Sequence, residues 1–137
     1  MIDYKERSKN WLEQAEYDLK SARANLERKD FSLVCFLSEQ ATQKALKGFL
    51  ISRKQIHSQV HAITKLLKQA VKFNEEFDKF IDEGKILDKY YLSTRYPDTL
   101  PEPLLPFEAY SEKEAKEAMA ISRRIFDFIH RLVSKNS

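Results

Sequence analysis

The chain has 137 residues and a formal net charge of +3, with 42% hydrophobic and 33% charged residues. This balance excludes a disordered polyelectrolyte, and no apolar run approaches the roughly 20 residues that a membrane-spanning helix needs. The single cysteine, Cys35, excludes an internal disulfide. Because the first residues are also too polar for a signal peptide, we expect a cytoplasmic protein without a membrane partner.

Helical periodicity runs through the whole chain, and glycine is scarce. Apolar side chains recur every three to four residues over 3–28 and 31–52. The second of these segments is so apolar that we expect it at the centre of the fold. Gly48 in its interior indicates close packing against a neighbouring helix.

The second half of the chain predicts shorter elements. These are a helix over 58–73 with Ser58 as N-cap, a helix over 75–91 interrupted around Gly84, a Pro-rich loop over 95–110, and a last helix over 111–134 opened by the capping box Ser111-Glu112-Lys113-Glu114. The sum is one all-α domain spanning 1–137. We expect an antiparallel up-and-down four-helix bundle, with a short extra helix and the Pro-rich loop before the last helix.

Positive charge is concentrated in the middle of the chain. No Asp or Glu occurs between Gln40 and Asn74. Seven basic residues fall in the same interval: Lys44, Lys47, Arg53, Lys54, Lys65, Lys68 and Lys72. Such a local excess favours an anion-binding face.

The predicted helix over 58–73 aligns four basic residues on its outer side. His61, Lys65, Lys68 and Lys72 are spaced by four, three and four residues. The row is either a solvated face or a phosphate-binding ridge, and both interpretations stay open. His61 is expected in the first turn, at the positive end of the helix dipole, where a neutral imidazole can hydrogen-bond a ligand.

Residues 87–98 form the chemically densest stretch. Asp88, Tyr91 and Arg95 are spaced by three and four residues, so they share one face of a helix that Pro97 ends. In a functional interpretation, Arg95 binds phosphate and a tyrosine stacks on a base. In a structural interpretation, an Asp88–Arg95 ion pair fastens the loop to the helix end.

The last helix carries a second candidate site. Arg123 and His130 are seven residues apart on one flank, whereas Arg124 and His130 are turned about 120° from each other. An imidazole and a guanidinium can cleave RNA, the first by moving the 2′-hydroxyl proton and the second by stabilising the phosphorane. The alternative is an ordinary half-exposed surface pair.

Other classes of site lack their residues. The sequence has no Cys/His cluster for zinc and no Gly-rich phosphate loop. We therefore expect neither a metal nor a cofactor.

Four motifs in order resemble the HEPN domain family, the "higher eukaryotes and prokaryotes nucleotide-binding" domain. The motifs are Trp11-x-x-x-Ala15-x-x-Asp18-Leu19-x-x-Ala22, Cys35-Phe36-x-x-x-Gln40-Ala41-x-x-Lys44-Ala45-Leu46-Lys47, His61-x-Ile63-x-x-Leu66-Leu67 and Leu87-Asp88-x-Tyr90-Tyr91-x-x-x-Arg95-Tyr96-Pro97-Asp98. The last one resembles the branch with the Arg-Tyr-Pro-Asp signature. The resemblance covers essentially the whole chain.

The resemblance implies a homodimeric helical bundle. It also implies a nucleotide ligand such as ATP, and a small nucleotidyltransferase as partner in a prokaryotic two-component or toxin–antitoxin pair. The implied binding residues are Arg95 and Tyr96 in contact with the ligand and His61, Lys44, Lys47, Asp88 and Tyr91 around them.

The family also contains metal-independent RNases that use an Arg-x4-6-His motif in the last helix. Arg123 and Arg124 both fit that spacing to His130. Because the Arg-Tyr-Pro-Asp branch is tied mainly to nucleotide binding, we expect binding rather than cleavage. RNA cleavage is the first alternative, and a non-catalytic protein-interaction module is the second.

Overall fold

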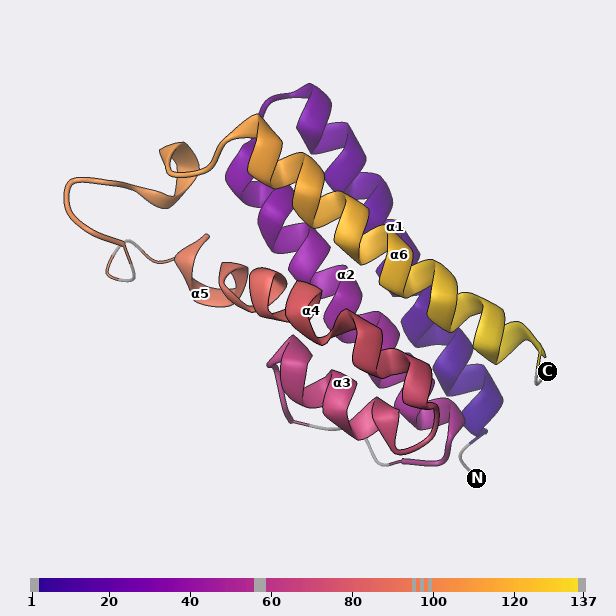
Figure 1. Ribbon diagram of the computed structural model, residues 1–137. Helices are drawn as coiled ribbons and strands as arrows, with labels where there is room; N and C mark the ends of the chain where they lie inside the picture. The colour runs from indigo at the N-terminus through magenta and orange to yellow at the C-terminus, as the bar shows by residue number, and fades with distance from the viewer. Residues whose placement is uncertain (1–2, 56–58, 95, 97, 99, 136–137) are drawn as a thin grey trace.

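The computed structural model describes residues 3–55, 59–94, 96, 98 and 100–135, and within these ranges the chain is all-helical (Figure 1). The elements in chain order are α1 (Tyr4–Glu27), α2 (Phe31–Ser52), α3 (Ile63–Val71), the 3₁₀ helix η1 (Glu75–Phe80), α4 (Ile81–Asp88), α5 (Tyr90–Ser93), the 3₁₀ helix η3 (Pro106–Glu108) and α6 (Glu112–Lys135).

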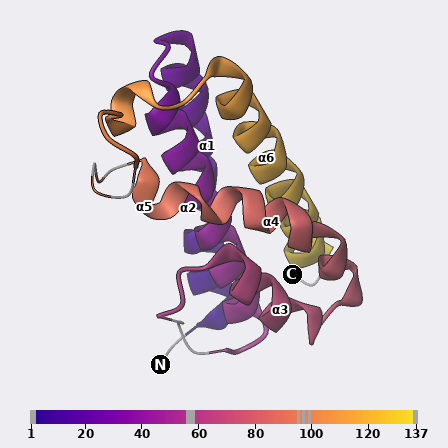
Figure 2. The ribbon, with the colours of Figure 1, turned by 60° about the vertical axis from the view of Figure 1, so that its left-hand side comes forward.

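The long helices α1, α2 and α6 pack against one another; the shorter α3 lies by the end of α2, and α4 crosses the middle of the molecule (Figures 1 and 2). The α2 helix is buried on most of its sides, which confirms the prediction that it is central. In place of a fourth long helix, the described residues form the short α3, η1 and α4. The predicted up-and-down four-helix bundle therefore stays a prediction, whereas the all-α class is confirmed for the described residues.

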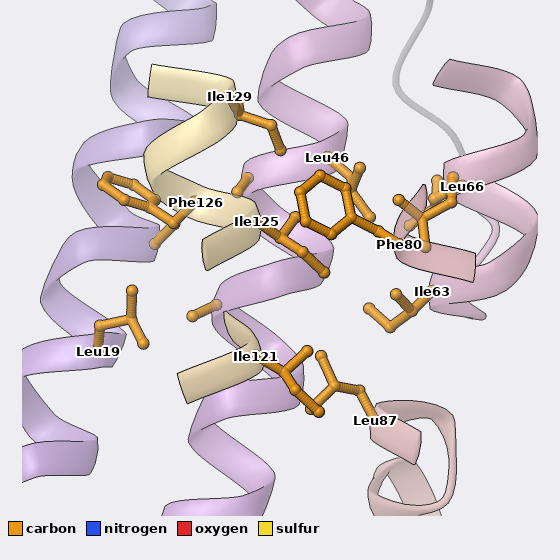
Figure 3. Packing of buried hydrophobic residues seen from close by; sticks show 14 of the residues in the cluster. Leu19, Leu46, Ile63, Leu66, Phe80, Leu87, Ile121, Ile125, Phe126 and Ile129 are labelled. Atoms are coloured by element: carbon orange, nitrogen blue, oxygen red, sulfur yellow. The ribbon is translucent and has the colours of Figure 1, made fainter. Parts of the chain in front are cut away.

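The core joins the long helices to the short ones. Figure 3 shows Ile121 of α6 beside Leu87 of α4. It also shows Ile125 of α6 beside Phe80 of η1 and Leu46 of α2. Because the two isoleucines are four residues apart, they extend from the same side of α6. Burial of this apolar surface holds α3 and α4 against the long helices.

Both glycines lie inside helices, at close helix–helix contacts. A Cβ on Gly48 would lie 3.1 Å from Trp11 Cβ, so α1 and α2 approach closely there, as predicted. The predicted interruption at Gly84 is wrong, because α4 continues through this residue. A Cβ on Gly84 would lie 2.7 Å from Leu67 Cδ1, and the glycine therefore serves the packing of α4 on α3.

The α3 helix begins at Ile63, later than predicted, and Ser58 lies outside the described residues. His61 precedes the helix, so its predicted place in the first turn is wrong. The reason is a cap from a distant element: the Asp88 carboxylate accepts hydrogen bonds from the Ile63 and Thr64 amides at 2.5 and 3.2 Å. It also accepts one from the Thr64 hydroxyl at 2.8 Å.

The capping box predicted for the last helix is confirmed. The Glu114 amide donates to Ser111 Oγ, and the Ser111 amide donates to Glu114 Oε1, both at 3.1 Å. These two reciprocal bonds satisfy amides that the first helical turn cannot satisfy, so the start of α6 is set by local sequence.

Candidate functional site

A row of polar side chains is buried along α2. Glu39, Gln43 and Lys47 are spaced by four residues and are 0%, 5% and 6% exposed. Gln43 Nε2 donates to Glu39 Oε2 at 2.6 Å. Burial of charged and amide groups is unfavourable unless they find partners, so this row is unusual on a helix whose other buried residues are mainly apolar.

The middle residue of the row, Gln43, contacts His61, which stacks on a second ring from another element. His61 Nδ1 lies 3.4 Å from Gln43 Oε1, and the His61 ring stacks on Tyr91 of α5 with the centroids 5.1 Å apart and the planes 17° apart. Because the Gln43 nitrogen already donates to Glu39, its oxygen faces His61, and Nδ1 is the donor in this contact. We call these five residues, Glu39, Gln43, Lys47, His61 and Tyr91, the polar corner.

Burial changes the chemistry of the lysine in the polar corner. Desolvation lowers the pKa of Lys47, and the negative charge of Glu39 opposes this effect by raising it. His61 is exposed, whereas Tyr91 is half-buried. The corner therefore has a buried polar floor and an aromatic edge that solvent reaches.

Two of the predicted site residues make structural contacts. Lys44 Nζ forms an ion pair with Asp18 of α1 at 2.6 Å, and this pair joins two long helices. The Asp88 carboxylate caps α3. Neither contact is with a residue of the polar corner, although the Asp88 cap at Ile63 lies only two residues after His61 in the chain.

The other predicted contact residues lie just after α5. Tyr96 is 49% exposed. Arg95 lies outside the described residues, as does Pro97, so their place in the predicted site is not described.

The candidate residues of α6 point to different sides. The Arg123 guanidinium lies 5.5 Å from the centre of the Phe126 ring, and the His130 ring stacks on the same phenyl ring at 5.8 Å. Arg124 instead forms an ion pair with Glu83 of α4. Of the two arginines that fit the motif, Arg123 is thus the one on the side of His130.

A groove with a volume of about 680 Å³ separates α1 from the end of α6. Its lining includes Leu12, Tyr17, Phe126, His130 and Val133. A smaller hollow shares Lys20 with it and is lined by Arg123, so both residues of the predicted nuclease pair border one continuous face. We call this face the α1–α6 groove.

The described residues form neither a metal-binding cluster nor a membrane-spanning helix. These ranges contain no group of three or more His, Cys, Asp or Glu residues that could hold a metal ion. Within the same ranges, no helix is both long and apolar enough to cross a bilayer.

Comparison with known proteins assigns the fold and sequence to one family. The sequence-family model described as "HEPN domain" matches residues 8–132 of this chain. This chain belongs to the HEPN domain family. The match confirms the resemblance seen in the four sequence motifs.

Solved structures agree with the assignment to the HEPN family. The crystal structure of TT1696 from Thermus thermophilus superposes on this chain with a TM-score of 0.81, and the two sequences are 35% identical. The match covers 91% of this chain and 97% of TT1696. ST0689, described as an archaeal HEPN homologue, is 33% identical, with a TM-score of 0.77, covering 93% and 98%. Human sacsin is 25% identical over 115 residues, which are 82% of this chain and only 2% of sacsin.

For this HEPN chain, sequence reasoning did not single out two residues of the polar corner, Glu39 and Gln43. The signal that could have found them is their spacing of four residues with Lys47 on a helix that is otherwise apolar. What the spacing does not reveal is burial, because burial depends on which distant elements pack on α2.

Proposed function

We propose that this HEPN chain binds a nucleotide at the polar corner. The observation that carries the proposal is the burial of Glu39, Gln43 and Lys47 next to an exposed stacked ring. Buried charges contribute little to stability and are often replaceable by apolar residues, so the presence of Glu39 and Lys47 favours a role in binding.

The chemistry of the corner suits a base and a sugar. The base stacks on His61, whose ring is supported by Tyr91. Behind this ring, Gln43 accepts from His61 and donates to Glu39, so the buried row fixes the orientation of the ring on which the base stacks. Tyr96, which follows α5 and is 49% exposed, is proposed to contact the ligand as well, and the family resemblance adds Arg95 to this proposal.

Isothermal titration with AMP, ATP and GTP tests the proposal. We expect saturable binding, weakened about tenfold or more in Tyr91→Ala, because the His61 ring loses its support and a base–aromatic stack contributes about 1–3 kcal/mol. Tyr17→Ala is the matched control because Tyr17 is an exposed tyrosine of α1, 64% accessible and remote from the corner in the sequence. The proposal would be wrong if no nucleotide gave saturable heat, or if Tyr91→Ala and Tyr17→Ala lost the same affinity.

The wider assembly belongs to the same proposal. Resemblance to the Arg-Tyr-Pro-Asp branch supports a cytoplasmic homodimer, built from one domain over 1–137, that pairs with a small nucleotidyltransferase in a prokaryotic two-component or toxin–antitoxin system. Co-expression with a nucleotidyltransferase from a neighbouring reading frame tests this part. Co-purification without any nucleotide affinity would favour the non-catalytic interaction module instead.

A second candidate function is metal-independent RNA cleavage. The observation that favours it is the shared contact of Arg123 and His130 with Phe126, beside the α1–α6 groove. Seven residues of helix place the two side chains about 10 Å apart along the axis, too far for both to hold one phosphate. In a homodimer, His130 of one copy and Arg123 of the other can meet at one phosphate.

The nuclease candidate has its own assay. Purified protein is incubated with total RNA in EDTA, and the products are separated on a denaturing gel. Cleavage lost in His130→Ala and in Arg123→Ala, but kept in Arg124→Ala, would place this function above nucleotide binding. Intact RNA at high protein concentration would eliminate it.

A further inference from the structure

Three lysines form a row on the outer side of α3. Lys65, Lys68 and Lys72 are all exposed, and their spacing of three and four residues confines them to an arc of about 60° on an α-helix. The opposite side of α3 is buried through Ile63, Leu66, Leu67 and Ala70. We call the three lysines the lysine ridge.

No acidic side chain pairs with the ridge in the described part of the chain. α3 itself contains no Asp or Glu. The acidic residues of the adjoining η1 and α4 that form ion pairs do so with other cations: Glu76 with Lys79, Asp82 with Lys85 and Glu83 with Arg124. The ridge therefore keeps three unneutralised positive charges within about 10 Å along the helix axis.

The ridge starts close to the polar corner. Lys65 follows His61 by four residues, and a chain spans at most about 3.6 Å per residue, so their Cα atoms lie within about 14 Å. The start of α3 is fixed by the hydrogen bonds from Ile63 and Thr64 to Asp88, two residues before α5 begins. The same cap holds the first lysine at a set distance from the aromatic stack.

We infer that the ligand of the polar corner carries a chain of phosphates that lies along the lysine ridge. This inference rests on the nucleotide binding proposed above and adds its substrate class: a nucleoside polyphosphate or the end of an RNA strand rather than a nucleoside or a monophosphate. The base occupies the His61–Tyr91 stack and the successive phosphates meet Lys65 and then Lys68. Ammonium groups bind phosphate as point charges, which needs alignment but no fixed fork geometry.

The test compares ligands that differ only in phosphate number. AMP, ADP, ATP and inorganic tripolyphosphate are titrated calorimetrically into the wild-type chain and into Lys65→Gln/Lys68→Gln/Lys72→Gln. We expect ATP to bind more than about tenfold tighter than AMP in the wild type. In the triple variant, the affinity for ATP should fall to that for AMP, while the affinity for AMP should stay unchanged.

A matched variant controls for the loss of net charge. Lys29→Gln/Lys113→Gln/Lys135→Gln removes three lysines that are also exposed but lie outside α3. This control keeps the preference for ATP. Circular dichroism of both triple variants checks folding, which we expect to be unaffected because all six lysines face solvent.

The outcomes separate this inference from the proposal beneath it. If ATP binds no tighter than AMP, the role of the lysine ridge is overturned and nucleotide binding stands. The same conclusion follows if the control triple loses as much ATP affinity as the ridge triple. If no nucleotide binds, nucleotide binding fails. The lysine ridge is then judged by tripolyphosphate alone. Tripolyphosphate that binds the wild type but not the ridge triple would support the ridge as a phosphate site. Tripolyphosphate that does not bind the wild type would overturn it.

A short single-stranded oligoribonucleotide distinguishes the two sources of phosphate. An oligonucleotide that binds tighter than ATP would identify an RNA strand as the ligand. In that case, the slope of log affinity against log salt concentration should fall by about 2 in the ridge triple, since each contact with a single-strand phosphate contributes about 0.7. Binding no tighter than that of ATP would identify the nucleoside polyphosphate. An oligonucleotide affinity that is equal in the ridge and control triples would count against the ridge for RNA.

Discussion

The polar corner and the α1–α6 groove are built in opposite ways. In the corner, charged and amide groups are buried: Glu39 is fully inaccessible, and burial lowers the pKa of Lys47. In the groove, apolar residues such as Leu12, Phe126 and Val133 lie among exposed charges, such as Lys20 and the half-accessible Arg123. One site is marked by buried polarity and the other by its concave shape.

The difference teaches how each site should respond to mutation. Buried polar groups depend on one another, because removal of one partner leaves the other desolvated and unpaired. Exposed pairs in water contribute little, and either partner can be lost at small cost. Corner variants should therefore affect stability and binding together, whereas groove variants should affect only function.

The largest effect is expected at Glu39. Replacement by leucine leaves Lys47 buried without its negative neighbour and Gln43 without its acceptor, so Glu39→Leu should lower the free energy of unfolding by about 3 kcal/mol. Urea unfolding followed by circular dichroism measures it. Glu16→Leu, which alters a partly exposed glutamate of α1, should change the free energy of unfolding by less than about 0.5 kcal/mol.

A double variant sharpens this prediction. Glu39→Leu/Lys47→Leu removes both charges and should recover part of the stability lost in the single variant, while nucleotide affinity is lost. A single variant as stable as the wild type would mean that the corner is not an interdependent unit, and the contrast with the groove would disappear.

Asp88 should rank second. Asp88→Ala removes the acceptor of two amides and one hydroxyl at the start of α3, and we expect a loss of about 2 kcal/mol in unfolding free energy. The melting temperature reports it. Asp82→Ala is the control, because its side chain is 97% exposed on the same helix. Equal melting temperatures for the two variants would argue against the interhelical cap.

The third prediction concerns pH. Lys47 has its ordinary pKa of 10.5 in the unfolded chain and a lower pKa in the folded protein. Between the two values the unfolded chain binds more protons, so the contribution of Lys47 to stability rises as pH increases through that window towards 10.5. Below the folded pKa, its full unfavourable contribution is present.

Unfolding in urea at several pH values from neutral to alkaline checks this sign. The stability of the wild type relative to Lys47→Met should increase with pH, and Lys68→Met, which alters an exposed lysine of α3, should not change the trend. A relative stability that falls with increasing pH would show that the positive charge is favoured in the fold.

The smallest effect is expected on α6. Arg124→Ala breaks an ion pair with Glu83 in which the arginine is 55% exposed, so stability should change by about 0.5 kcal/mol or less. The melting temperature measures it, and Arg123→Ala is the companion variant on the groove side. A loss above about 1 kcal/mol would mean that the α4–α6 contact depends on this pair and would weaken the contrast between the two regions.

Much of the fold could be predicted from local pattern. Both ends of α2 were predicted as observed, and the capping box before α6 was confirmed bond by bond. The start of α3 could not be predicted, because its cap comes from Asp88, 25 residues later in the chain. Gly84 was misread for the same reason, since the residue that requires a glycine there is Leu67 of another helix.

The candidate site was predictable only in part. His61, Lys47 and Tyr91 were named from sequence; the structure stacks His61 on Tyr91 and places Lys47 four residues after Gln43, which contacts His61. Lys44 is instead paired with Asp18 of α1. Gln43, which links them, carries no distinctive sequence signal other than its spacing.

The sequence by itself determined the helical composition, the central position of α2, the capped start of α6 and membership in the HEPN family. These follow from periodicity, capping residues and short motifs, which act within a few residues of chain. Only the tertiary structure decided that Glu39 and Lys47 are buried, that Arg123 and not Arg124 shares a side with His130, and that Asp88 caps α3. Each of these depends on desolvation or on a hydrogen-bond partner that a distant element supplies.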